Sequence, residues 1–80
     1  MDLRKKLNYQ SWHRGTREND LLLGSFADAV LATLSETDLK AYQDMLEHED
    51  AELFAWITGQ YPIPENEPMV RRIRDFHQCR

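Results

Sequence analysis

Charged, aromatic and imidazole side chains crowd around one glycine near the start of the chain. The segment runs Trp12, His13, Arg14, Gly15, Thr16, Arg17, Glu18, Asn19, Asp20. Gly15 can adopt a positive φ or let another backbone approach closely. The guanidinium groups of Arg14 and Arg17 suit carboxylate or phosphate partners, and Glu18 and Asp20 add the opposite charge. This combination favours a surface that recognises another molecule by charge-assisted hydrogen bonds.

A purely structural interpretation explains most of the same residue types. Gly15 would only end a helix, the arginines beside it would interact with helix dipoles, and Glu18 and Asp20 would begin the next helix. It does not explain why Trp12 and His13 lie in the same short joint. The position of Trp12, either exposed or capping the core, stays open. Taken without any resemblance, the residues favour the structural interpretation slightly.

Other groups that could do chemistry are dispersed. His13, His48 and His77 are far apart in the sequence, and the acids beside His48 are too local to complete a metal site. The single Cys79 excludes an internal disulfide and a cysteine-based zinc site. The three glycines are isolated, so no phosphate-binding loop is present. We therefore expect no metal site and no catalytic residue.

Length and charge limit the function further. Eighty residues fit one domain (1–80) and leave little core for a deep, water-excluding active site. The net charge is −4, and Lys40 is the only lysine or arginine between Glu18 and Glu67. Such an acidic middle repels nucleic acid phosphates, although most of its carboxylates are explained as a solvated face.

Nothing in the sequence suggests a membrane span or secretion. No apolar run is long enough for a transmembrane helix. No apolar segment follows the charged residues at the start, so we expect no secretory signal. With one cysteine, a reducing cytosolic compartment fits best.

Two helices are expected to hold the 12–20 segment between them. Apolar residues at spacings of three and four predict helices over residues 2–12 and from 17 to about 34. Asp2 can cap the first helix, whose lysines and Arg4 should lie outside. Gly24, inside the second helix, marks either a kink or a close helix contact.

Three more short helices complete the expected fold. Ser35 is a cap signal for the third helix, and Asp50 is expected to cap the fourth, which Gly59 would end. The extended connector 61–64 contains two prolines, and Pro68 suits the first turn of the last helix. The result is an all-α, single-domain bundle of about five short helices. Its expected core includes Leu22, Leu23, Phe26, Ala27, Val30, Leu31, Leu34, Leu39, Tyr42, Met45, Leu46, Leu53, Phe54, Trp56, Ile57, Met69, Val70, Ile73 and Phe76.

Two blocks of sequence resemble a known family. Residues 14–18, Arg-Gly-Thr-Arg-Glu, match the Arg-Gly-x-x-Glu signature of the succinate dehydrogenase assembly factors that promote flavinylation, called SdhE in bacteria and with mitochondrial counterparts. Residues 46–57, which contain Asp-Ala-Glu-Leu-Phe-Ala-Trp-Ile, are similar to the second block of that family. The proline-containing connector and the basic last helix also look like it. The resemblance therefore covers nearly the whole chain.

The resemblance implies a small helical assembly factor that is not an enzyme. It would bind the flavoprotein subunit of succinate dehydrogenase, and in some bacteria that of fumarate reductase, and assist covalent attachment of FAD to a histidine there. FAD would be handled through the partner, with no cofactor held tightly by this chain. We expect a monomer in the bacterial cytoplasm, or in the mitochondrial matrix of a eukaryote, with no direct membrane insertion and no nucleic acid partner.

The same resemblance assigns the docking surface. Arg14, Gly15 and Glu18 fall on the signature, and Arg17 occupies one of its variable positions. A weaker variant gives Glu18 a direct acid or base role on the flavin. The expected partner-binding residues are Trp12, His13, Arg14, Gly15, Arg17, Glu18 and Asp20.

Two other function classes remain as alternatives. A general acidic helical adaptor, unrelated to flavin, would use Glu47, Glu49 and Glu52 to bind its partner, and charge reversal there would weaken binding more than changes at 14–18. An enzyme with its own pocket is disfavoured by size and by the missing ligand cluster; turnover by the isolated protein would support it.

Overall fold

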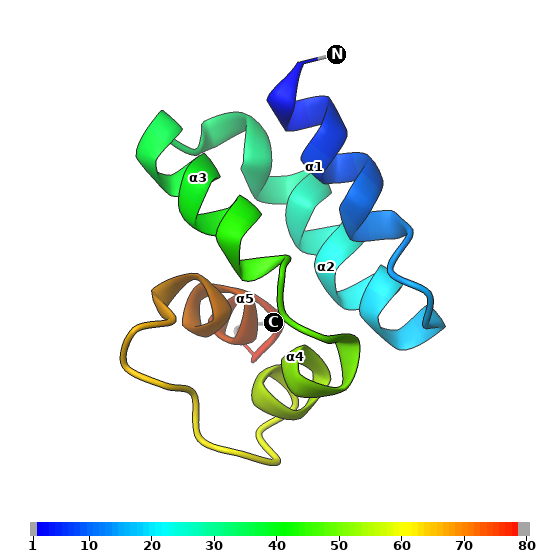
Figure 1. Ribbon diagram of the computed structural model, residues 1–80, viewed down its shortest axis with the longest axis vertical. Coiled ribbons are helices and arrows are strands. Elements are labelled where there is room, and N and C mark those ends of the chain that lie inside the picture. The colour runs from blue at the N-terminus through cyan, green and yellow to red at the C-terminus, as the bar shows by residue number, and fades with distance from the viewer. Residues whose placement is uncertain (1, 79–80) are drawn as a thin grey trace.

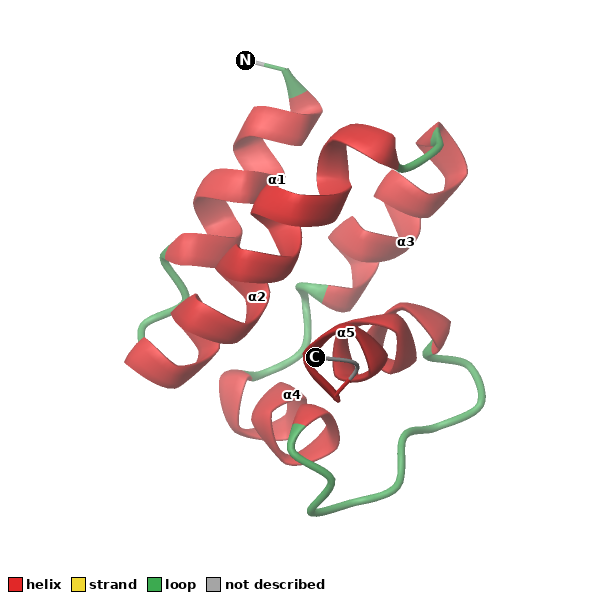
Figure 2. Ribbon diagram, turned by 180° about the vertical axis from the view of Figure 1, so that it is seen from behind, coloured by secondary structure: helices red, strands yellow, loops and turns green. Residues whose placement is uncertain are grey.

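Five α-helices make up the fold of the described part of the chain. The computed structural model describes residues 2–78, so Cys79 lies outside the described residues. The helices are α1 (Leu3–Trp12), α2 (Arg17–Val30), α3 (Glu36–Met45), α4 (Asp50–Ile57) and α5 (Pro68–Gln78), and the 3₁₀ turn η1 (Leu31–Thr33) follows α2. Residues 2–78 contain no strand (Figures 1 and 2). The expected all-α bundle of about five short helices is confirmed.

The helices enclose one core between two parts of the bundle. Helices α1 and α2 form an antiparallel hairpin, α3 descends beside it, and α4 and α5 lie together at the other end (Figure 1). Helix α5 packs against α2, α3 and α4, and α2 packs against α1, α4 and α5. No helix among residues 2–78 has the length and apolar character needed to cross a bilayer. The core contains Leu7, Leu23, Phe26, Ala27, Leu31, Leu34, Leu39, Tyr42, Met45, Leu46, Leu53, Trp56, Ile57, Ile63, Met69, Val70 and Ile73.

Most of the expected helix ends are confirmed. The Asp2 carboxylate accepts a hydrogen bond from a first-turn amide of α1, and the Ser35 hydroxyl does the same for α3. Gly59 follows α4 with a φ of +84°. The backbone N–H of Gln60 then donates to the Ala55 carbonyl at 2.8 Å, which satisfies one of the last carbonyls of α4.

Two helix ends differ from the prediction. Asp50 does not cap α4: Glu49 occupies the cap position without a side-chain hydrogen bond, and Asp50 is the first helical residue. The Asp50 carboxylate is instead bound by Arg14 and Asn19. Helix α2 ends at Val30 rather than near residue 34, and the chain tightens into η1.

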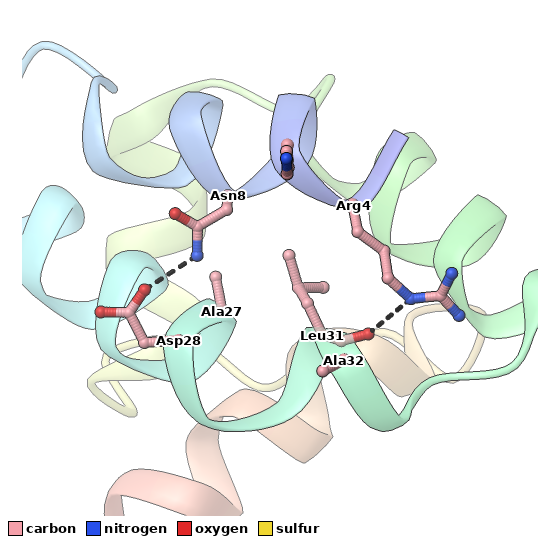
Figure 3. A pocket seen from close by; sticks show the side chains of 7 residues that line it. Arg4, Asn8, Ala27, Asp28, Leu31 and Ala32 are labelled. Carbon is pink, nitrogen blue, oxygen red and sulfur yellow. Dashed lines mark hydrogen bonds between the residues drawn. The ribbon is translucent and has the colours of Figure 1, made fainter. Parts of the chain in front are cut away.

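Arg4 was expected to lie outside, and that prediction is wrong. Its guanidinium donates from Nε to the Leu31 carbonyl at 3.2 Å and from Nη2 to the Leu34 carbonyl at 2.7 Å. Figure 3 shows Arg4 reaching from α1 to Leu31 in η1, beside the pair that Asn8 and Asp28 form at 2.8 Å. Arg4 thus supplies donors at the end of η1, to the Leu34 carbonyl and to the Leu31 carbonyl, which also accepts from the Leu34 N–H.

Gly24 marks a close contact between α1 and α2. A Cβ added at Gly24 would overlap the indole ring of Trp12. The Trp12 side chain is therefore half-buried against α2, and its Nε1–H donates to Asp28 Oδ1 at 3.2 Å. The open choice between a kink and a helix contact is settled in favour of the contact.

Candidate functional site

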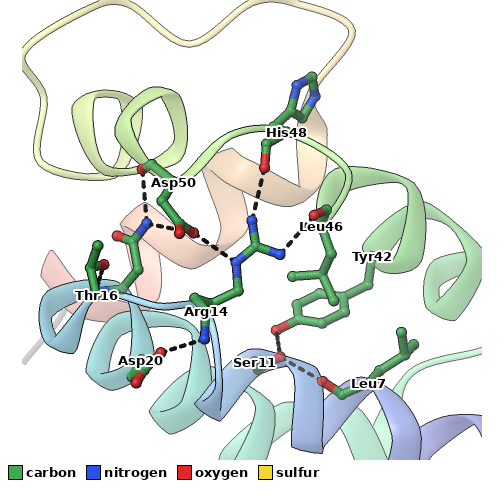
Figure 4. A network of polar contacts seen from close by, with 10 residues as sticks. Leu7, Ser11, Arg14, Thr16, Asp20, Tyr42, Leu46, His48 and Asp50 are labelled. Atoms are coloured by element: carbon green, nitrogen blue, oxygen red, sulfur yellow. Dashed lines mark hydrogen bonds and ion pairs between the residues drawn. The ribbon is translucent and has the colours of Figure 1, made fainter.

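Arg14 joins three segments of the chain. Its Nε donates to Asp50 Oδ1 at 2.8 Å, its Nη1 to the Leu46 carbonyl at 2.7 Å and its Nη2 to the His48 carbonyl at 2.8 Å (Figure 4). Its side chain is only 14% exposed. Each guanidinium nitrogen thus has a partner inside the protein, and Arg14 ties the joint between α1 and α2 to the turn between α3 and α4.

The backbone around Gly15 forms the turn into α2. The Arg14 N–H donates to Asp20 Oδ1 at 2.6 Å, and the Thr16 hydroxyl accepts a hydrogen bond from the Asn19 N–H. Gly15 has a φ of +103°, in the region that favours glycine. Asp20 and Thr16 therefore satisfy donors at the start of this joint, and Gly15 supplies the conformation that lets the chain reverse.

Asn19 links α2 directly to α4. It is 1% exposed, and its Nδ2 donates to the Asp50 carbonyl at 2.8 Å and to Asp50 Oδ1 at 3.3 Å. Its Oδ1 has no hydrogen-bond partner among residues 2–78. A buried amide oxygen without a donor is costly and therefore notable.

One of the outward residues of the segment, Glu18, lines a groove. Gly15, Arg17 and Glu18 are exposed, and His13 is exposed at the end of α1. Between the first turns of α2 and α4 lies a groove of about 480 Å³. Its lining consists of Thr16, Glu18, Asn19, Asp50, Ala51 and Phe54. The signature thus has an inward residue, Arg14, and outward residues beside a groove.

An exposed aromatic pair lies on the other side of the joint. The ring of His13 stacks on that of Tyr9, with centroids 4.0 Å apart, and its Nδ1 lies 2.7 Å from the Tyr9 carbonyl oxygen. Tyr9 is 60% exposed. The neighbouring Trp12 is turned away toward Asp28. Hydrogen bonds from Asn8, the larger cause, and from Trp12 lower the pKa of the Asp28 carboxyl.

A buried pair of hydroxyl groups links α1 and α3 next to the site. Tyr42 from α3 places its hydroxyl 2.5 Å from Ser11 Oγ, and Ser11 donates to the Leu7 carbonyl at 2.8 Å (Figure 4). Burial raises the pKa of Tyr42 to about 12. A neutral hydroxyl network therefore holds α3 against α1 beside Arg14.

The structure brings most of the predicted site residues together, but in two roles. Arg14 and Asp20 hold the joint in shape, whereas Gly15, Arg17 and Glu18 face outward. Their assignment to partner binding stays a prediction. Within residues 2–78 no group of histidine, cysteine and acidic side chains is placed to hold a metal ion.

Three residues of the site were missed by the sequence analysis. Asn19 lies four residues before Leu23 on the inward face of α2, so its place on the apolar stripe was an available signal. Phe54 was assigned to the core but lines the groove. No local pattern could pair Asp50 with Arg14, because 36 residues separate them.

The family model and the similar proteins agree with one another in what they are named for. A family model described as flavinator of succinate dehydrogenase matches residues 5–77. A mitochondrial succinate dehydrogenase assembly factor 2 from Dictyostelium discoideum is 49% identical over 76 residues, which cover 94% of this chain and 54% of that relative. The FAD assembly factor SdhE of Acetobacter pasteurianus is 39% identical over 79 residues, covering 96% of this chain and 72% of the relative.

The extent of these matches also differs between relatives. A mitochondrial assembly factor 2 from Caenorhabditis briggsae is 43% identical over 65 residues, covering 79% of this chain and 53% of the relative. The chain thus spans about half the length of these two mitochondrial relatives and more of the bacterial one. No solved structure matches the chain significantly.

Proposed function

The chain belongs to the succinate dehydrogenase flavinator family, and from that premise we propose that it is an assembly factor for a flavoprotein. It binds the flavoprotein subunit of succinate dehydrogenase and promotes covalent attachment of FAD to a histidine of that subunit. The observation that carries this proposal is the family match over residues 5–77, nearly all of the described helical bundle. The acidic-adaptor alternative has no comparable support.

The docking surface is the joint between α1 and α2 with its adjoining groove. Gly15 and Glu18 face the partner, together with Arg17 and the exposed ring of His13. Arg14 keeps this surface in shape, because its guanidinium holds the α3–α4 turn against the joint. The half-buried Trp12 packs the two helices that carry the surface.

The mechanism is stabilisation of one arrangement of the partner. Covalent flavinylation requires a histidine nitrogen to be held against the 8-methyl group of the flavin. Orienting bound reactants can supply a large part of a barrier. A docking protein that binds the productive arrangement more tightly shifts the population toward it and needs no catalytic side chain of its own.

Several finer properties belong to the same proposal. The chain has no enzymatic activity alone, holds no FAD tightly and acts as a monomer. The flavoprotein of fumarate reductase is a second client. The chain works in the bacterial cytoplasm, or in the mitochondrial matrix of a eukaryotic source, where its relatives named mitochondrial would act.

Affinity purification from the source cells tests the proposal. The tagged chain is expected to retain the flavoprotein subunit, which is identified by its covalent flavin fluorescence in a denaturing gel. Charge reversal at Glu65, an exposed acid on the connector before α5, is the control and should leave this band unchanged, and charge reversal at Glu47 tests the acidic-adaptor alternative. Purification without any flavoprotein, or loss of binding only on Glu47 reversal, would favour the acidic adaptor.

A further inference from the structure

Three side chains at the groove between α2 and α4 carry acceptor oxygens. Glu18 is exposed at its edge, and the buried Oδ1 of Asn19 has no partner among the described residues. Asp50 also lines the groove, and its Oδ2 lies on the side that faces Gly15. These three side chains offer acceptor oxygens. The groove therefore suits an occupant that brings hydrogen-bond donors.

The side-chain donors of Asn19 and Arg14 are already engaged within the chain. Asn19 uses its Nδ2 on Asp50, and its backbone N–H is capped by Thr16. Arg14 uses its guanidinium on Asp50 and two carbonyls, outside the groove lining. None of these donors reaches Asn19 Oδ1, which stays without a partner among the described residues.

The charge of the groove is negative. Arg14 neutralises Asp50, which leaves the Glu18 carboxylate as the net charge of the lining. The two helix N-termini contribute only about half a positive charge each, and their first turns carry four acids. Those acids are Glu18 and Asp20 in α2 and Asp50 and Glu52 in α4.

The remaining lining is apolar. Ala51 and the half-buried ring of Phe54 form the wall contributed by α4. Lysine and arginine side chains combine an aliphatic stem with a charged, donor-only head. Such a side chain can place its stem on Ala51 and Phe54 and its head at the exposed Glu18 carboxylate, next to the buried Asn19.

We propose that this groove receives a lysine or arginine side chain of the flavoprotein subunit. Figure 4 shows Thr16 at the start of α2 and Asp50 at the start of α4, the two ends between which the basic side chain enters. The inference rests on the proposed function and adds the chemistry of the partner at this site. It also gives Glu18 a binding role rather than a chemical one.

Calorimetric titration of the purified flavoprotein subunit tests the groove. Ala51→Leu fills the groove with a side chain that suits a helix, and it should raise Kd by roughly tenfold or more. Ala29→Leu places the same side chain on the exposed part of α2 and is the matched control, with Kd unchanged. Circular dichroism melting of both variants checks that the fold is retained.

The charge is tested separately with Glu18→Gln. This change keeps the shape but removes the carboxylate, so Kd should rise about tenfold. The dependence of Kd on salt should also become flatter, because screening weakens charge pairs. The chain Ala51→Leu/Glu18→Gln should bind little worse than either single variant, since both act on one contact.

The possible outcomes distinguish this proposal from its alternatives. If Ala51→Leu weakens binding but Glu18→Gln does not change the salt dependence, the occupant is apolar and the proposal is wrong. If Ala51→Leu binds like Ala29→Leu, the groove is outside the interface. Normal binding with lost flavinylation in Glu18→Gln would assign Glu18 the chemical role instead. Wild-type protein that fails to bind would overturn the proposed function, and this inference with it.

Discussion

The Arg14 guanidinium and the Asp50 carboxylate form an ion pair across 36 residues of sequence, with Nε and Oδ1 2.8 Å apart. The pair fixes the start of α4 beside the joint that precedes α2. The signature arginine of this chain thus supports the surface from inside, and the glycine and glutamate of the signature are left to face outward. One short motif combines a structural residue with residues available for recognition.

Asp50→Asn should destabilise the fold. It removes the charge that Arg14 faces while keeping the volume, and a partly buried guanidinium without a counter-ion is costly. We expect a loss of about 1–3 kcal/mol in the free energy of unfolding. Urea denaturation measures it, with Glu47→Gln as the control that removes an exposed carboxylate. Equal stability of both variants would show that the ion pair contributes little.

Gly24→Ala should destabilise the protein although alanine favours helices. An added Cβ overlaps the Trp12 ring, and overpacking of this kind costs about 1–3 kcal/mol. Replacing Trp12 by leucine in the same chain should remove most of that penalty, which a double-mutant cycle of thermal melts would reveal. A Gly24→Ala variant more stable than wild type would contradict the close contact between α1 and α2.

Two variants of Gly15 separate backbone strain from steric block. Both Gly15→Ala and Gly15→Arg must adopt the φ of +103°, so each should lose on the order of 1–3 kcal/mol of stability. A Cβ there meets only ordinary contact, 3.8 Å from Asp50 Oδ2. Gly15→Arg alone adds bulk to the docking surface, so it alone should abolish flavoprotein binding in calorimetry.

Two other results for these Gly15 variants would contradict this expectation. If Gly15→Ala binds as poorly as Gly15→Arg while both remain folded, the turn conformation itself is what the partner needs. If both unfold, the joint is structural and the docking assignment of Gly15 loses its support.

The raised pKa of Tyr42 predicts that the protein loses stability at high pH. Its pKa is raised from 10.0 to about 12 by burial, so the folded state holds the proton more tightly than the unfolded chain. The contribution is complete below pH 10 and is lost as the pH rises from 10 toward 12, at about 1.4 kcal/mol per pH unit. Urea unfolding across this range should show that slope in wild type and a smaller one in Tyr42→Phe. Identical slopes would contradict a buried, neutral Tyr42.

Local sequence patterns were enough to predict the helices. The three- and four-residue spacing of apolar side chains marks each helix, and Ser35 and Gly59 act where their types suggest. The end of α2 was less predictable, because the chain passes into η1, where Arg4 from another helix binds the Leu31 carbonyl. A contact between distant residues decides that boundary.

The interior of the site depended on contacts that sequence order does not reveal. A capping role for Asp50 was reasonable from its position before α4, yet Arg14 and Asn19 take its carboxylate. Similarly, the sequence around Gly24 is compatible with a kink, whereas in the fold the ring of Trp12 lies against this glycine. The signature residues could be found from sequence, but which of them face inward required the fold.

The central claim is that this chain promotes covalent flavinylation, and covalent flavin on the partner measures that most directly. Cells of the source organism that lack the chain are compared with cells that regain wild type or Gly15→Arg, and flavin fluorescence of the succinate dehydrogenase flavoprotein is scanned in a denaturing gel, normalised to the amount of that subunit. We predict weak fluorescence without the chain, recovery with wild type and no recovery with Gly15→Arg. Equal fluorescence in all these cells would contradict the account.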